Sequence, residues 1–180
     1  LDPDMVIFGK ALGNGYAITA ILGKRNVMEC SQKSFISSTF WTERIGPTAA
    51  LKTLEIMKKN KSWKYITKIG KQIKKKWNLI ADLNNLHIST WGLDALPGFS
   101  FKSPNDLKYR TFITQEMLKK GFLASNSVYC STSHDSITLE KYYVSLMAIF
   151  QKINKFENER ERVDDFLDGG TIYPGLNRMN

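Results

Sequence analysis

The feature that most constrains this chain is a short apolar run that ends in a lysine and two glycines. It reads Asp-Met-Val-Ile-Phe-Gly-Lys-Ala-Leu-Gly-Asn-Gly over residues 4–15. An extended segment at Met5–Phe8 places Lys10 at the mouth of a buried sheet edge, and Gly13 and Gly15 let the backbone turn sharply beside a flat ligand. A lysine held there loses solvation and therefore basicity, as a Schiff-base nucleophile requires. For a lone lysine, a surface position at a strand end is the commoner case. Other parts of the sequence must therefore distinguish a surface lysine from a Schiff-base lysine.

Size and composition predict a globular, soluble protein. The chain has 180 residues, enough for one or two small domains with a real core. Hydrophobic residues make up 42% and aromatic residues 12%, and no segment is of low complexity. No apolar run approaches the length of a membrane helix and no secretory leader opens the chain, so we expect no membrane partner.

The cysteines predict neither a disulfide framework nor a metal site. There are two, Cys30 and Cys130, and neither has a His or Cys companion at metal-ligand spacing. This usage makes the cytoplasm the default compartment.

The N-terminal third predicts strands and one helix. The apolar runs Met5–Phe8 and Ala17–Leu22 are typical of buried strands, and residues 35–36 are expected to form a short third one. Pro47 suits the first turn of a helix, which we predict to reach about Lys58.

A long amphipathic helix is expected next. Its apolar residues recur every three or four positions and therefore share one face. They are Trp63, Ile66, Gly70, Ile73, Trp77 and Ile80. Two strands follow at His87–Trp91 and Gly98–Lys102, the second with Phe99 and Phe101 on one side.

The last third predicts two helices with a strand between them. Ser103 is placed to cap the first helix, with Asp106 closing a capping box. Phe122–Ser125 is expected to be a strand, and Asp135 or Ser136 to cap the last helix. Beyond that helix the chain turns acidic, and we expect its Gly- and Pro-containing tail to be strapped on the surface. The order of elements indicates an α/β fold in two parts.

A lysine-rich stretch explains much of the net charge of +9. Ten lysines and one acid, Glu55, lie between Lys52 and Lys76. Such a stretch suggests nucleic-acid binding. However, it contains no arginine and no known binding motif, and its lysines mostly occupy the polar side of the long helix. We interpret them as a solvated face and expect no nucleic-acid partner.

Six blocks of sequence carry a resemblance to a known family. They occur in the family's order: Pro3–Gly15, Ala17–Arg25, Ser38–Leu51, Gly92–Phe101, Gly121–Asn126 and Ser133–Asp135. On these blocks the chain resembles the class III aminotransferases, enzymes of fold type I that use pyridoxal 5'-phosphate (PLP). The segment around Lys10 is most similar to the glutamate-1-semialdehyde 2,1-aminomutase branch.

The resemblance implies roles for individual residues. Lys10 would form the Schiff base with the cofactor aldehyde and move a proton during amino-group transfer. Thr39, helped by Ser38, would hydrogen-bond the cofactor phosphate of the other subunit, which implies a homodimer with an active site shared across the interface. Hydroxyls and backbone amides in short loops are good phosphate donors. A turn threonine that satisfies local backbone is the commoner alternative.

Three further polar residues each have two competing interpretations. Glu43 and Arg44 either contact a carboxylated substrate or form an ion pair at a helix entrance, and we favour the ion pair. For His134, beside a helix start, we favour capping or packing over a catalytic role.

The resemblance also implies that the chain is the C-terminal part of a fold type I enzyme. Residues 1–57 would be the edge of the large PLP-binding domain, and residues 58–180 a small C-terminal α/β domain with an acidic tail. The family's phosphate loop, its ring-stacking aromatic residue and its Asp partner for the pyridine nitrogen cannot be assigned here. We therefore expect the chain to be inactive by itself.

Three functions stay open. An aminomutase converts glutamate-1-semialdehyde to 5-aminolevulinate without an added amino donor. A class III aminotransferase needs a donor and an acceptor, such as another small ketone or a sugar. The third and most remote is a basic nucleic-acid-binding module, which salt-sensitive retention on nucleic acid would reveal.

Overall fold

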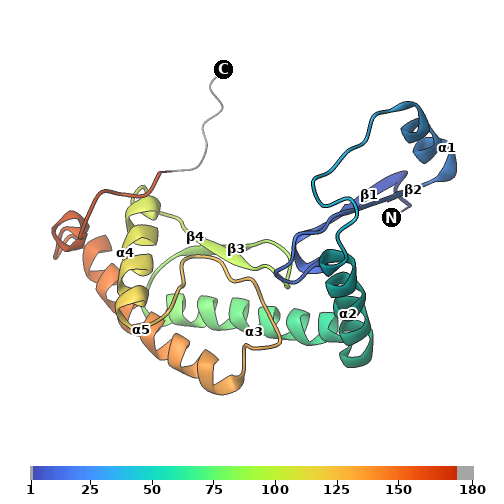
Figure 1. The fold of residues 1–180 in the computed structure, drawn as a ribbon. Coiled ribbons are helices and arrows are strands. Elements are labelled where there is room, and N and C mark those ends of the chain that lie inside the picture. Colours follow the sequence, from blue (N-terminus) through green and yellow to red (C-terminus); the bar gives the residue numbers. More distant parts are fainter. Residues whose placement is uncertain (1, 174–180) are drawn as a thin grey trace. The chain divides into compact units, whose positions relative to one another are not determined.

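The computed structural model describes residues 2–173, and the chain divides into two compact units, Leu1–Ser62 and Trp63–Asn180. We call them the N-terminal and C-terminal units. In the first, the helices and strands are β1 (Met5–Phe8), β2 (Ala20–Gly23), α1 (Arg25–Met28) and α2 (Ile45–Asn60), with the 3-10 turns η1 (Lys10–Leu12) and η2 (Glu29–Lys33) (Figure 1). In the second they are α3 (from Ser62 to Leu83), β3 (Ile88–Trp91), β4 (Gly98–Phe101), α4 (Asp106–Lys119), α5 (Ser136–Glu157) and the 3-10 turn η3 (Val163–Phe166).

The β1 and β2 strands of the N-terminal unit pair antiparallel, with Phe8 opposite Ala20. An ion pair closes the other end of this ladder, where Lys24 Nζ lies 3.0 Å from Asp4 Oδ1. Hydrogen bonds to the carboxylates of Asp4 and Asp2 raise the pKa of Lys24. Both predicted strands are therefore present, but the burial expected of them is wrong, because Ile7 is 69% exposed.

The segment between η2 and α2 contains no strand, contrary to the sequence prediction for residues 35–36. Phe35 is 95% exposed, and among residues 2–173 no strand pairs with this segment. The helix predicted from Pro47 is confirmed and starts two residues earlier, at Ile45.

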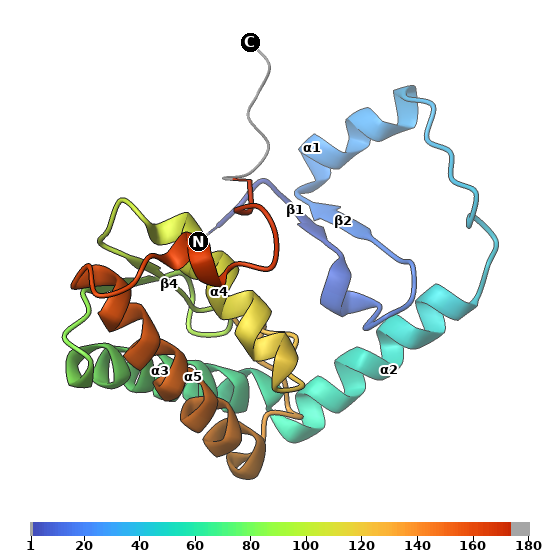
Figure 2. The same ribbon diagram turned by 90° about the vertical axis from the view of Figure 1, so that its left-hand side faces the viewer.

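The C-terminal unit is built on α3 and α5, which lie side by side (Figure 2). The Trp77 indole N–H of α3 donates to the Tyr142 hydroxyl of α5 at 2.8 Å, and the Asn154 amide of α5 donates to the carbonyl of Asn84, which directly follows α3, at 2.7 Å. The antiparallel pair β3–β4 has Trp91 opposite Gly98.

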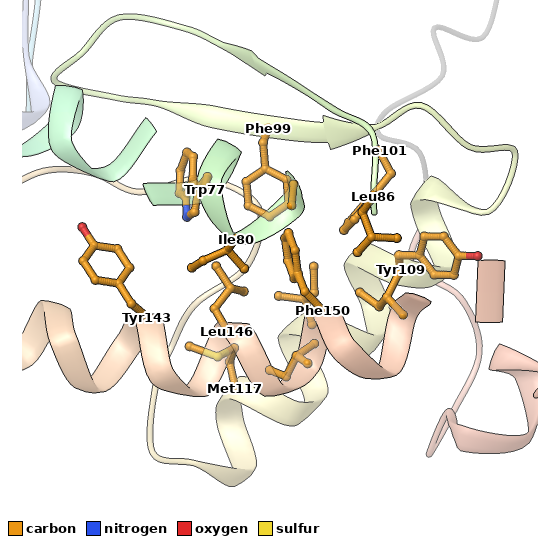
Figure 3. Close-up of a cluster of buried hydrophobic side chains, with 14 of the residues drawn as sticks. Trp77, Ile80, Leu86, Phe99, Phe101, Tyr109, Met117, Tyr143, Leu146 and Phe150 are labelled. Atoms are coloured by element: carbon orange, nitrogen blue, oxygen red, sulfur yellow. The ribbon is translucent and has the colours of Figure 1, made fainter. Parts of the chain in front are cut away.

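Aromatic side chains from α3, β4, α4 and α5 fill the core of this unit (Figure 3). Phe99 is fully buried, with its ring centroid 4.8 Å from that of Trp77 and 5.8 Å from that of Phe150. The predicted apolar face of α3 is confirmed at Ile73, Trp77 and Ile80, which are buried, whereas Trp63 at the start of the helix is 45% exposed.

Two local predictions for this unit are wrong. No strand forms at residues 122–125, because the extended pairing starts only after them: Phe99 N–H donates to the Asn126 carbonyl and Val128 N–H to the Pro97 carbonyl. The expected capping box is also absent. Instead, the Asp106 carboxylate accepts from the Phe101 N–H at 2.7 Å, so it ties β4 to the start of α4.

The acidic segment after α5 forms ion pairs with α4, and the tail predicted to be strapped on the surface is held to α4 at Ile172, whose N–H donates to the Thr111 hydroxyl at 3.0 Å. Lys108 pairs with Asp164 at 2.8 Å and Lys119 with Asp168 at 2.9 Å. The predicted Pro-Gly end of the tail, residues 174–175, lies outside the described residues. Within residues 2–173, every helix is too short or too polar to cross a bilayer.

Candidate cofactor site

Lys10 lies in the one-turn helix that directly follows β1. Three backbone hydrogen bonds close the turn: Leu12 N–H donates to the Gly9 carbonyl, and the N–H groups of Gly13 and Asn14 both donate to the Lys10 carbonyl. Lys10 has φ +50°, in the left-handed region. This conformation costs a non-glycine residue about 1 kcal/mol or more, and such strain is concentrated at functional sites.

Close backbone packing fixes the turn from its far side. A Cβ atom at Gly13 would lie 2.0 Å from the Tyr16 carbonyl oxygen and 2.8 Å from Ile18 Cγ2, so only glycine fits there. Because the chain doubles back through Tyr16, the Lys10 turn has a defined place in the N-terminal unit.

The start of α2 packs against the same segment. A Cβ atom at Gly46 would lie 2.7 Å from the Ala17 carbonyl oxygen, and η1 contacts α2. The Glu43 carboxylate accepts from the backbone N–H groups of Ile45 at 2.5 Å and Gly46 at 3.2 Å, and so caps the helix. The ion pair favoured for Glu43 and Arg44 is therefore wrong, because the carboxylate is held by backbone amides.

Ser38 and Thr39 lie in the exposed loop that leads into α2. The Ser38 hydroxyl accepts from the Phe40 N–H at 3.3 Å. In the described part of the chain, no hydrogen bond joins either residue to the Lys10 turn. The Lys10 turn and the start of α2 thus lie together. The Ser38 and Thr39 hydroxyls lie on the loop that leads into α2.

Lys10 is exposed, which corrects the expectation of a buried sheet edge. The reason is that β1 and β2 form a two-stranded pair whose side chains are mostly exposed among the described residues.

Sequence reasoning missed Glu43 as a cap and Gly46 as the point where α2 approaches residue 17. An acid two residues before a helix start was the available signal for Glu43. The close approach at Gly46 is a tertiary contact with no local signal.

Residues 1–153 match the Aminotransferase class-III family. The chain belongs to the class III aminotransferases. The cofactor of this family of enzymes is PLP, which confirms the resemblance found in the sequence and the cofactor that it implied.

Curated relatives of this class III chain include both aminotransferases and aminomutases. The chain is 31% identical over 116 residues to the 3-aminobutyryl-CoA aminotransferase of Cloacimonas acidaminovorans, covering 64% of this chain and 28% of the relative. It is 27% identical over 170 residues to the glutamate-1-semialdehyde 2,1-aminomutase of Methanosphaera stadtmanae, covering 85% of this chain and 40% of the relative. The chain therefore spans well under half the length of these relatives.

Solved transaminases share the fold. The FumI protein of Sphingopyxis sp. MTA144, solved in its PLP internal aldimine form, superposes with a TM-score of 0.78 at 18% identity, over 92% of this chain and 40% of that one. An omega-transaminase from Sphaerobacter thermophilus gives 0.72 at 15% identity, over 83% and 38%. The predicted α/β fold, as part of a fold type I PLP enzyme, is confirmed.

The described residues fit two groups of PLP. A primary amine on a strained turn suits the aldehyde, and exposed hydroxyls with backbone amides suit the phosphate. No carboxylate in residues 2–173 has been assigned to the pyridine nitrogen, so the fit covers part of the cofactor.

Proposed function

We propose that the enzyme to which this chain contributes Lys10 carries out PLP-dependent amino-group transfer of the glutamate-1-semialdehyde 2,1-aminomutase kind. The observation that carries the proposal is the backbone of Lys10. Lys10 follows β1 in a turn with φ +50°, and Gly13, which closes this turn, packs so closely against residue 16 that only glycine fits there.

In this proposal Lys10 Nζ has two tasks. It binds the cofactor aldehyde, and once an incoming amine has released it, it carries a proton to and from the reacting carbon. PLP, when bound, supplies the electron sink for these steps. The hydroxyls of Thr39 and Ser38 bind the phosphate of the partner subunit's cofactor, so the enzyme would be a homodimer with shared sites.

We also propose the two-part organisation predicted from the sequence, with residues 1–57 as the edge of the large PLP-binding domain and residues 58–180 as the small C-terminal domain. A cytoplasmic location and the absence of a nucleic-acid partner stay predictions from cysteine usage and from the lysine pattern.

A second candidate is a class III aminotransferase acting on another small ketone or a sugar. The 31% identity to a 3-aminobutyryl-CoA aminotransferase favours it. The two candidates differ in one requirement: an aminomutase turns over a single substrate, whereas an aminotransferase needs an amino donor and a carbonyl acceptor.

The test is an assay of the full-length enzyme with glutamate-1-semialdehyde, with and without an added amino donor. Turnover without a donor is the expected result, and turnover only with a donor would favour the aminotransferase. Lys10→Arg should reduce turnover by several orders of magnitude, because its guanidinium does not form the Schiff base. Lys33→Arg, at an exposed lysine of the same unit, is the matched control and should leave turnover unchanged.

A further inference from the structure

The C-terminal unit contains a pocket of about 300 Å³ between α3, α5 and the loop that joins α4 to α5. This volume is at the lower end for small-molecule sites and has room for roughly ten non-hydrogen atoms. Its walls are mostly apolar and include Ile73, Phe122, Ala124, Val128 and Leu139.

Tyr142 lines this pocket, and its side chain carries a buried hydroxyl. The residue is 6% exposed, and its hydroxyl oxygen accepts from the Trp77 indole N–H at 2.8 Å. Burial raises the pKa of Tyr142, so the hydroxyl keeps its proton. Within residues 2–173 no hydrogen bond has this hydroxyl as its donor, so its proton is available to a ligand.

His134 adds a second donor to the same pocket. Its Nδ1 accepts from the Ser131 backbone N–H at 3.0 Å. Because a backbone N–H can only donate, the neutral imidazole carries its proton on Nε2. The Tyr65 hydroxyl donates to the His134 carbonyl at 3.0 Å, which anchors this turn to α3.

The charges and the exposed residues around the pocket further restrict the chemical class of its ligand. No Lys, Arg, Asp or Glu lines the pocket and its one basic side chain is His134, so no permanent cation offsets the cost of moving a carboxylate out of water. Two lining residues are largely exposed, Leu123 at 97% and Tyr129 at 72%, and they offer an apolar contact at the mouth.

We propose that this pocket binds a small neutral carbonyl compound, a ketone or aldehyde with an apolar chain, whose oxygen accepts from Tyr142 and His134. The proposal rests on the C-terminal unit alone and stands whether or not Lys10 is the cofactor lysine.

The test titrates the full-length enzyme with 2-octanone and follows the Trp77 indole N–H by NMR, with the resonance assigned from Trp77→Phe. A carbonyl that accepts from the Tyr142 hydroxyl changes the group to which Trp77 donates, so its resonance should shift and saturate. Octanoate, similar in size but charged, should bind at least about tenfold more weakly.

Three variants locate the site. Tyr142→Phe should weaken 2-octanone binding about fivefold, since it removes one hydrogen bond. Ala124→Leu, which fills the pocket and keeps both donors, should abolish binding. Tyr143→Phe is the matched control, because this buried neighbour lies outside the pocket and its hydroxyl has no partner in the described residues.

Three results would overturn the proposal. They are the absence of a saturable shift in the folded wild-type chain, binding that survives Ala124→Leu, and octanoate binding as tightly as the ketone.

Discussion

Replacing Gly13 by alanine tests whether close packing holds the Lys10 turn. The new Cβ would lie 2.0 Å from the Tyr16 carbonyl oxygen, whereas carbon atoms normally pack at roughly 3.5–4 Å. The backbone would have to move by more than about 1 Å. Both hydrogen bonds of Gly13 resist this movement: its N–H donates to the Lys10 carbonyl and its carbonyl accepts from the Tyr16 N–H, each at 3.2 Å.

Overpacking and the loss of one hydrogen bond together should cost the N-terminal unit about 3 kcal/mol. Native-state hydrogen exchange of the β1–β2 amides measures this cost, and exchange should become about a hundredfold faster. Gly9→Ala is the matched control: its Cβ would lie 3.3 Å from the Thr19 methyl group, which can shift, so the cost should stay below about 1 kcal/mol. Unchanged exchange in Gly13→Ala, or an equal loss in both variants, would refute the reasoning.

Three further predictions concern the C-terminal unit. Gly70→Ala would place a Cβ 1.5 Å from the Asp94 carbonyl oxygen, and urea unfolding should show a loss above about 3 kcal/mol; near-wild-type stability would contradict the close approach. Phe99→Ala should cost about 3–5 kcal/mol in the same assay, because the ring is fully buried, and a loss below about 1 kcal/mol would count against the aromatic core. The Thr138 N–H lowers the pKa of Asp135 below its usual 3.8, so the cap's contribution is full above that pH and is lost as the pH falls through the lowered value. Asp135→Asn keeps the cap without titrating, so stability followed by circular dichroism should fall less steeply with decreasing pH in this variant than in the wild type. The same dependence of stability on acid pH in both proteins would argue against this role.

The helices were predictable because their signals are local. The apolar face of α3 follows from a repeat of three and four residues, and Pro47 and Asp135 mark helix starts through backbone chemistry that acts within one turn. The alternation of Phe99 and Phe101 likewise predicted β4.

The predictions that were wrong depended on contacts between residues far apart in the sequence. An apolar run such as Met5–Phe8 predicts extension, but it does not say what covers the strand, and here its side chains are mostly exposed. Residues 122–125 have strand-like composition, yet the segment around Pro97 and Phe99 pairs with Asn126 and Val128 instead. The identity of Lys10 as the candidate cofactor lysine came from the sequence, whereas its left-handed backbone and the role of Gly46 needed the structure.

Reductive trapping tests the central claim most directly. The full-length enzyme is incubated with PLP, reduced with borohydride and digested, and the phosphopyridoxyl-bearing peptide is identified by mass spectrometry. We predict a single modified residue, Lys10, and loss of the label in Lys10→Arg. A label on any other lysine, such as those of α3, or no label at all on the folded enzyme, would contradict the account.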